Sequence, residues 1–154
     1  MSPLGQELIR AVPTVKADAP LGTAIETLVE AGLPALPVVG DGDRLVGVFG
    51  ERDVIKAVLP GYVGELSGAA FLSAALDEAL EHRPECVHEP VSKYRTTEHV
   101  EVPSDVSYAQ LAETFLHHRV SVLPVVEQGR VTGAVTRRDY VRALAKRLTG
   151  SNRR

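Results

Sequence analysis

The tetrapeptide Leu-Pro-Val-Val occurs twice in this sequence, at residues 36–39 and again at residues 123–126. Each copy is a short apolar run bounded by turn residues, which is typical of a buried strand. After a turn that contains glycine, each copy continues into a second apolar segment, at 45–49 or 131–135. We therefore predict two adjacent strands at each of the two sites.

The similarity extends beyond the tetrapeptides and makes the chain an internal repeat. Residues 12–39 align with 99–126 at an offset of 87, and residues 44–58 align with 130–144 at an offset of 86. These 43 aligned positions contain 13 identities, and most substitutions keep apolar character. Self-similarity of this kind indicates a fold built from equivalent units.

Each copy predicts the same order of elements, β-α-β-β-α. A short extended segment, 14–16 or 101–103, precedes a helix that starts after 18–20 or 105–107. Pro20 suits a first helical turn, and Ser107 with Gln110 has the pattern of a capping box. The second helix is predicted over 53–59 in the first copy and over 139–148 in the second.

These elements predict an α/β fold, more narrowly an α+β sandwich. Neither copy, at roughly 45–50 residues, has enough core to be stable alone, so the two should pack as one pseudo-twofold module. We place the first repeat at 8–60, a helical linker at 61–96, the second repeat at 97–148 and a basic tail at 149–154. The linker carries an extra helix over about 70–82 and a short helical turn at 91–95.

Composition narrows the class of protein. The 154 residues are 44% hydrophobic and 24% charged, as in an ordinary globular chain. Lys and Arg number 17 against 20 Asp and Glu, and this net charge of −3 argues against a dedicated nucleic-acid binder. One cysteine, no apolar run of membrane-spanning length and no secretory signal favour a cytoplasmic protein without a membrane anchor.

The second copy carries the motif that suggests a family. Leu-Pro-Val-Val, a turn, and then Gly133-Ala-Val-Thr136-Arg-Arg-Asp139 resemble the cystathionine β-synthase (CBS) domain, and two such repeats in tandem resemble a CBS pair. The resemblance implies a sandwich that dimerises into a flat disc. It also implies clefts between the repeats that bind an adenine nucleotide (AMP, ADP or ATP) or another adenosyl ligand such as S-adenosylmethionine or NAD.

The resemblance further implies a regulatory role. Such modules sense an adenosyl ligand and signal to a partner protein by a change of shape, and free-standing copies exist. We therefore expect a homodimer with an unidentified regulated protein, no enzyme activity and no catalytic cofactor.

Four residues of the second copy acquire roles from the resemblance. Asp139 would accept hydrogen bonds from both ribose hydroxyls, since a carboxylate can accept from a vicinal diol. Thr136 would contact ribose or phosphate, and Arg137 and Arg138 would clamp phosphate oxygens. Free N–H groups at the helix start would also favour an anion. The same residues fit a plain helix N-cap, and the two interpretations are compatible.

The first copy departs from this pattern. It keeps Arg52 and Asp53, but Gly50 replaces the threonine and Glu51 stands where the second copy has Arg137. The first cleft thus loses a hydroxyl contact and gains a negative charge. We expect it to take a less charged adenosyl ligand, or none.

The remaining candidates lie on strands and helix ends. By resemblance, the leading strands read the adenine edge with backbone groups, and the neighbouring apolar residues form walls; a role in the core alone is the simpler interpretation. The nucleotide-binding candidates outside the two motif helices are Thr14, Val15, Leu33, Ala35, Pro37, Val100, Val120, Val122, Pro124 and Gly133.

No metal site or catalytic constellation is predicted. His82, Cys86 and His88 fall close together, but their spacing matches no strong metal motif. Two other functions stay open: a dimerisation or interaction module that binds no ligand, and a nucleic-acid regulator that uses the basic C-terminal end.

Overall fold

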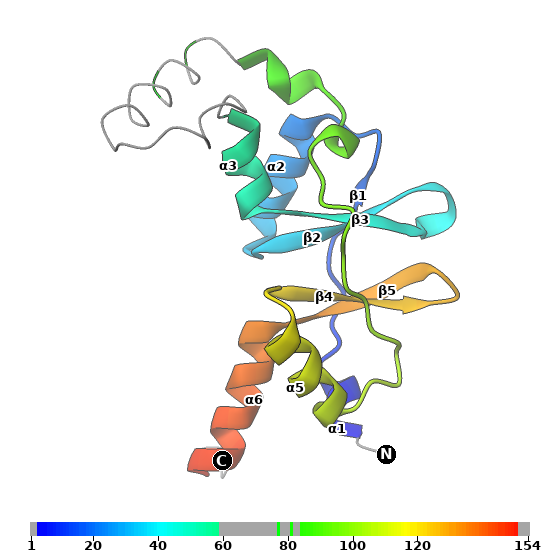
Figure 1. Ribbon diagram of the computed structural model, residues 1–154, viewed down its shortest axis with the longest axis vertical. Helices are drawn as coiled ribbons and strands as arrows, with labels where there is room; N and C mark the ends of the chain where they lie inside the picture. The colour runs from blue at the N-terminus through cyan, green and yellow to red at the C-terminus, as the bar shows by residue number, and fades with distance from the viewer. Residues whose placement is uncertain (1–2, 59–76, 78–80, 82–83, 151–154) are drawn as a thin grey trace.

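Two small β-sheets lie face to face at the centre of the computed structural model, and helices cover the outer side of each (Figure 1). The structure describes residues 3–58, 77, 81 and 84–150. In the first sheet, β1 (Val15–Lys16) runs parallel to β2 (Ala35–Val39), which pairs antiparallel with β3 (Leu45–Gly50). The second sheet pairs β4 (Val122–Glu127) with β5 (Arg130–Thr136). The two sheets correspond to the two copies of the repeat.

Each copy adds two helices to its sheet, and this confirms the predicted α+β sandwich. The four helices are α2 (Leu21–Ala31), α3 (Glu51–Val58), α5 (Tyr108–His117) and α6 (Arg137–Thr149). Shorter helical segments are α1 (Pro3–Glu7), η1 (Asp41–Asp43), η3 (Pro84–His88) and η4 (Val91–Lys93). The second copy forms a weaker leading strand than predicted, because only Val102 of the segment 101–103 pairs, as a parallel bridge to Val125.

The segment that leads into each repeat pairs with the sheet of the other repeat. Arg10 and Ala134 of β5 exchange two backbone hydrogen bonds of 3.0 Å. Thr96 and Val48 of β3 exchange two of 2.8 and 2.9 Å. In Figure 1 the two connecting segments run past both sheets in opposite directions. Since each repeat completes the sheet of the other, the two copies are interlocked in one unit.

Gly133 and Gly47 occupy matching positions beside these crossing segments. A Cβ at Gly133 would lie 2.8 Å from the carbonyl oxygen of Arg10, and a Cβ at Gly47 would lie 2.8 Å from that of Thr96. Only glycine allows the backbone of the crossing segment to come this close. The glycine shared by both copies is therefore a packing requirement.

Small side chains fill the space between the two sheets. Ala35, Val122 and Ala134 form a buried cluster, and Val12 and Val48 pack against it. A larger apolar core lies between each sheet and its helices, with Leu36 and Phe49 in the first copy and Leu111 and Leu123 in the second. The contact between the sheets thus buries a face that either copy alone would expose to water.

The second helix of each copy begins two residues earlier than predicted, at Glu51 and at Arg137. Asp53 and Asp139 are consequently the third residues of α3 and α6. An aspartate is favoured anywhere in the first turn, so its position does not mark the first helical residue. Pro20 likewise lies at the N-cap of α2 and not inside its first turn.

Other local predictions are confirmed or lie outside the described residues. Ser107 and Gln110 form the predicted capping box of α5, with reciprocal hydrogen bonds of 2.8 and 3.1 Å. The turn predicted at 91–95 is η4. The helix predicted over 70–82 lies, except at Asp77 and Glu81, outside the described residues. Within those residues no helix is both long and apolar enough to cross a membrane.

Candidate functional site

Two cavities lie between the repeats, and each is lined by residues of both copies. The Asp139 cleft has a volume of about 800 Å³ and is lined by Arg10, Gly32, Leu33, Pro34, Glu51, Ser121, Thr136, Arg137, Arg138, Asp139, Val141 and Arg142. The Asp53 cleft has a volume of about 500 Å³ and is lined by Pro34, Ala35, Val48, Gly50, Glu51, Arg52, Asp53, Lys56, Thr96, Glu98, His99, Val100, Arg119, Val120, Ser121, Val122 and Arg137. Both volumes are in the range of small-molecule sites.

The two clefts are built in the same way by the repeat. The start of α6 lines the Asp139 cleft together with Arg10 and residues 32–34. The matching elements, namely the start of α3, Thr96 and residues 119–121, line the Asp53 cleft. Each cleft therefore combines an aspartate from one repeat with the end of the first helix of the other.

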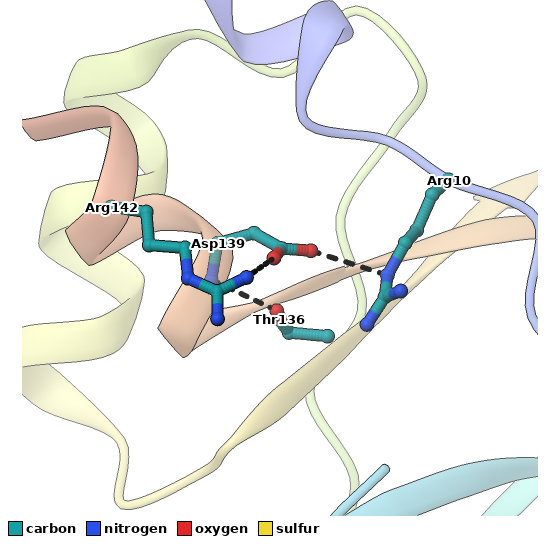
Figure 2. Close-up of polar contacts among 4 residues, drawn as sticks. All are labelled: Arg10, Thr136, Asp139 and Arg142. Carbon is teal, nitrogen blue, oxygen red and sulfur yellow. Dashed lines mark hydrogen bonds and ion pairs between the residues drawn. The ribbon is translucent and has the colours of Figure 1, made fainter. Parts of the chain in front are cut away.

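Asp139 is held at the start of α6 and faces two arginines (Figure 2). Its backbone N–H donates to the hydroxyl of Thr136, the N-cap residue, at 3.0 Å. Its carboxylate lies 3.1 Å from Nε of Arg10 and 3.9 Å from a terminal guanidinium nitrogen of Arg142. The Asp139 side chain is 23% exposed, so it is accessible from the cleft.

Asp53 is held differently at the start of α3. One carboxylate oxygen accepts the backbone N–H of Gly50 at 2.8 Å, and the other accepts the hydroxyl of Thr96 at 3.2 Å. The residue is only 8% exposed. Gly50 has no side chain that could accept a helical N–H, and the bond from its own N–H to Asp53 is the half of a capping box that the third helical residue supplies.

Charge distinguishes the clefts further. Four arginines line the Asp139 cleft against two acidic residues, Glu51 and Asp139. The Asp53 cleft also has four basic side chains, but three acidic ones, Glu51, Asp53 and Glu98, oppose them. The larger positive excess makes the Asp139 cleft the better environment for an anion.

Fewer free backbone donors point into the clefts than the sequence predicted. The N–H of Arg137 donates to the carbonyl of Ser121 at 2.9 Å, and the N–H of Glu51 donates to that of Pro34 at 3.0 Å. Asp139 uses its own N–H to bond Thr136. An anion in the Asp139 cleft would therefore depend mainly on side chains.

Most of the sequence-predicted candidates lie on one of the clefts. Those on the Asp139 cleft are Leu33, Thr136, Arg137, Arg138 and Asp139. Those on the Asp53 cleft are Ala35, Arg52, Asp53, Val100, Val120 and Val122, and Arg137 lines both.

Five candidates do not line either cleft. Val15 pairs with Val38 in the first sheet and is 4% exposed, and Thr14 precedes it on the surface. Pro37 and Pro124 lie within β2 and β4, where they are buried. Gly133 faces the backbone of Arg10. The four buried positions therefore have a core or packing role, whereas exposed Thr14 has neither.

Sequence reasoning missed Arg10 and Arg142 in the Asp139 cleft. Arg10 precedes the aligned segment by two residues, and extending the offset of 87 backwards pairs it with Thr97, next to the Thr96 that the structure places opposite Asp53. Arg142 follows Asp139 by three residues on one helix, which brings their side chains to the same face. Both signals were present in the sequence, although neither identifies a cleft by itself.

His99 is a further unpredicted residue of the Asp53 cleft. Its Nε2 lies 3.4 Å from a carboxylate oxygen of Glu101, while its Nδ1 is buried and has no hydrogen-bond partner among the described residues. Groups of three or more His, Cys, Asp or Glu arranged to hold a metal are also absent from the part of the chain that the structure describes, and His82 lies outside it.

Comparison with known proteins adds to this geometry. The family model for the CBS domain matches residues 6–60 and 91–146. The chain is 26% identical over 142 residues to the uncharacterized protein MJ1225 of Methanocaldococcus jannaschii, which covers 92% of this chain and 42% of that protein. The match to inosine-5'-monophosphate dehydrogenase of Aquifex aeolicus covers 22% of that enzyme. The chain thus spans less than half the length of these curated relatives.

Solved structures share the fold. The CBS domain of a CBS domain containing membrane protein from Sphaerobacter thermophilus matches with a TM-score of 0.68 at 28% identity, over 89% of this chain and 85% of that one. CBSX2 from Arabidopsis thaliana, solved in complex with AMP, matches with a TM-score of 0.68 at 22% identity, over 93% of this chain and 96% of that one. The second likeness concerns the fold alone.

Proposed function

This chain belongs to the CBS domain family, and from that premise we propose that its clefts bind adenine nucleotides or related adenosyl ligands. The observation that carries the proposal is the position of Asp139. Its partly exposed carboxylate stands in a cleft between the repeats, beside several arginines. A carboxylate that accepts from a ribose diol, next to cations that pair with phosphate, is a suitable recognition set for a nucleotide.

Within this proposal each residue of the Asp139 cleft has a defined task. Asp139 accepts the ribose hydroxyls, and a carboxylate has enough lone pairs to do so while it keeps one cation. Arg137 and Arg138, on the first turn of α6, pair with phosphate oxygens. Leu33 and Pro34, from the other repeat, supply the apolar wall for the base.

The regulatory part of the proposal follows from the place of the ligand. A molecule that contacts both repeats binds most tightly to one relative arrangement of them, and it shifts the population toward that arrangement. A protein that contacts both repeats would sense the shift. We therefore assign the chain a regulatory and not a catalytic role, with a further protein as its target.

A second copy of the chain is the assembly partner we propose. Four of the exposed apolar residues occur at matching positions of the two repeats: Val29 and Leu116 at the ends of the first helices, Ile55 and Val141 on the second helices. Their exposed fractions are 73, 83, 57 and 56%. A symmetric apolar set on both repeats suits a partner with the same twofold arrangement, which is another copy of this chain.

The Asp53 cleft supports the alternative of a module without a ligand. Asp53 is nearly buried, and both of its oxygens already accept hydrogen bonds from within the protein. The unpartnered Nδ1 of His99 favours a ligand there, so the two observations oppose each other. We propose that the Asp139 cleft binds first and that the Asp53 cleft takes only a less charged adenosyl ligand, if it takes one.

A ligand panel tests the proposed function. The melting temperature of the full chain would be measured with millimolar AMP, ADP, ATP, NAD and S-adenosylmethionine. A ligand that binds only the folded state raises the melting temperature. At a ligand concentration a hundredfold above Kd, it adds about 2.7 kcal/mol to the free energy of unfolding. Native mass spectrometry of freshly purified protein would report the bound mass.

Variants locate the binding site. Asp139→Asn keeps the shape of the side chain but removes its charge, and it should abolish most of the shift. Asp18→Asn is the matched control: Asp18 is exposed in the turn before α2, and its substitution should leave the shift intact. No shift with any ligand, or equal shifts in both variants, would rule out the proposed site.

A further inference from the structure

The two clefts differ at one position that lies outside the motif helices. Arg10 and Thr96 occupy equivalent places, since each pairs with the edge of the opposite sheet, at Ala134 or at Val48. Each also contacts the aspartate of its cleft. Thr96 donates a neutral hydroxyl to Asp53 at 3.2 Å, whereas Arg10 places a guanidinium 3.1 Å from Asp139.

This substitution changes what a ligand meets in the empty cleft. Asp53 has only neutral donors, whereas the carboxylate of Asp139 already has Arg10 and, more distantly, Arg142 as counter-ions. A ribose diol that approaches Asp139 must share the carboxylate with Arg10 or displace it. Displacement is unfavourable unless the released guanidinium finds another anion.

The backbone and side chain of Arg10 differ in their freedom. The backbone is fixed by its two hydrogen bonds to Ala134. The side chain is 50% exposed and borders the Asp139 cleft, a neighbouring cavity of about 790 Å³ that is also lined by Arg142 and Lys146, and a smaller one of about 330 Å³. The guanidinium therefore has room to turn while its attachment point remains at the edge of the cleft.

A phosphate on the ligand supplies the anion that Arg10 would need. Arginine pairs with phosphate through two parallel N–H donors, so the ion pair lost at Asp139 is replaced. Adenosine offers a diol without such a replacement. From this difference, and resting on the proposed function, we infer that Arg10 is a specificity-determining residue. Its ion pair with Asp139 in the empty cleft makes the cleft select phosphorylated adenine nucleotides over adenosine.

Calorimetric titration of AMP and adenosine tests this inference. The titrations use Asp53→Asn as the parent, so that only the Asp139 cleft contributes. In the parent, AMP should bind at least tenfold more tightly than adenosine. Arg10→Thr introduces the residue type that the Asp53 cleft has at this place. In this variant the dissociation constant of adenosine divided by that of AMP should fall about tenfold, through weaker AMP binding and unchanged or stronger adenosine binding.

Two further variants separate charge from shape. Arg10→Lys keeps the cation and should retain most of the preference for AMP, while its folding is protected because the pairing to Ala134 uses backbone atoms alone. Thr96→Arg, at an exposed position, should create a preference for AMP in the Asp53 cleft when Asp139→Asn is the parent. If the Asp53 cleft binds neither AMP nor adenosine, the Arg10→Thr and Arg10→Lys titrations alone test the inference.

The outcomes distinguish this inference from the proposed function. AMP binding that needs Asp139 but keeps the same AMP-to-adenosine ratio in Arg10→Thr would overturn the role of Arg10 and leave the nucleotide site standing. Absence of binding by AMP and adenosine to the wild-type chain would overturn both. A lowered ratio in Arg10→Thr and a retained one in Arg10→Lys would support the inference. If Asp53→Asn fails to fold, the Arg10 variants are made in the wild-type chain, and the ratio is taken from the tighter of the two binding sites in the titration.

Discussion

Single residues at matching positions give the two clefts different chemistry on the same backbone. Thr136 caps α6 with its hydroxyl, whereas Gly50 leaves the cap of α3 to Asp53. Arg10 replaces Thr96 beside the aspartate. The glycines that admit the crossing segments, in contrast, are the same in both copies. The clefts keep the Arg-Asp pair of the motif helices but differ in the residues around the aspartate, whereas the two glycines that allow the close backbone approach are unchanged.

The glycines provide a test at this scale. Gly133→Ala places a Cβ 2.8 Å from the carbonyl oxygen of Arg10, and Gly47→Ala places one at the same distance from that of Thr96. Since backbone must move to relieve each contact, we expect both to lower the free energy of unfolding by about 1–3 kcal/mol, measured in urea. Lys16→Ala, at an exposed position of β1, should change it by no more than about 0.5 kcal/mol.

A loss below about 0.5 kcal/mol in both glycine variants would mean that the crossing segments adjust freely. The interlocked arrangement of the two repeats would then be weaker than the close contacts indicate.

At the scale of elements, α6 is the helix that positions the Asp139 cleft, and an aromatic cluster anchors it. Tyr140 is 6% exposed, and its ring packs 5.2 Å from that of Tyr108 and 5.6 Å from that of Phe115. Its hydroxyl donates to the backbone carbonyl of Tyr108 at 2.8 Å. Because Tyr140 follows Asp139 directly, this anchor holds the first turn of α6 against α5 and fixes the direction of the carboxylate.

Alkaline titration tests the anchor. Burial, and secondarily the neighbouring Tyr108, raises the pKa of Tyr140 above its ordinary value of 10.0. The neutral form is thus favoured in the folded state, so its contribution is complete below pH 10 and is lost as the pH rises through the folded pKa. At pH 8, Tyr140→Phe should be about 1 kcal/mol less stable than the wild type. This gap should shrink above pH 10.

Thermal unfolding of both proteins between pH 8 and pH 11 would measure that gap. A gap that stays constant, or widens, across this range would contradict the buried position of the Tyr140 hydroxyl.

The sequence predicted the order of elements because each signal is local and appears twice. The strand pairs follow from Leu-Pro-Val-Val and the turns, and the capping box of α5 follows from Ser107 and Gln110. The crossing of Arg10 and Thr96 to opposite sheets was not predictable, since a single pair of backbone bonds leaves no periodic pattern. The aspartates of the clefts could be found from the motif. Their partners, Arg10 and Arg142, required the fold.

At the scale of the whole molecule, the two repeats share both the Asp139 cleft and the Asp53 cleft, so a ligand in either would couple binding to the arrangement of the repeats. The same twofold relation places apolar residues on both halves of the outer surface, at Val29, Ile55, Leu116 and Val141. A disc made of two chains would cover these residues. Because Val141 also lines the Asp139 cleft, the proposed dimer interface would border the proposed ligand site.

Light scattering on a size-exclusion column tests the assembly. The wild-type chain should elute as a dimer at tens of micromolar. Leu116→Glu and Ile55→Glu should shift it toward the monomer, because a charge would be buried at the interface. Leu148→Glu is the matched control: Leu148 is 84% exposed, close to the 83% of Leu116, but lies at the end of α6 outside the matched set, and it should leave the dimer intact.

A monomeric wild-type chain at this concentration would exclude the proposed dimer. Dissociation by Leu148→Glu with no effect of the other two variants would place the interface elsewhere.

Amide NMR titration with AMP is the sharpest test of whether a nucleotide binds between the repeats, on Asp139. Binding there should shift signals in both repeats at once, at Gly32 and Leu33 from the first and at Ser121, Thr136 and Asp139 from the second, all saturating with one dissociation constant. The Asp139→Asn variant should show none of them. Shifts confined to the basic end of α6, at Lys146 and Arg147, or no shifts at millimolar AMP, would contradict the claim.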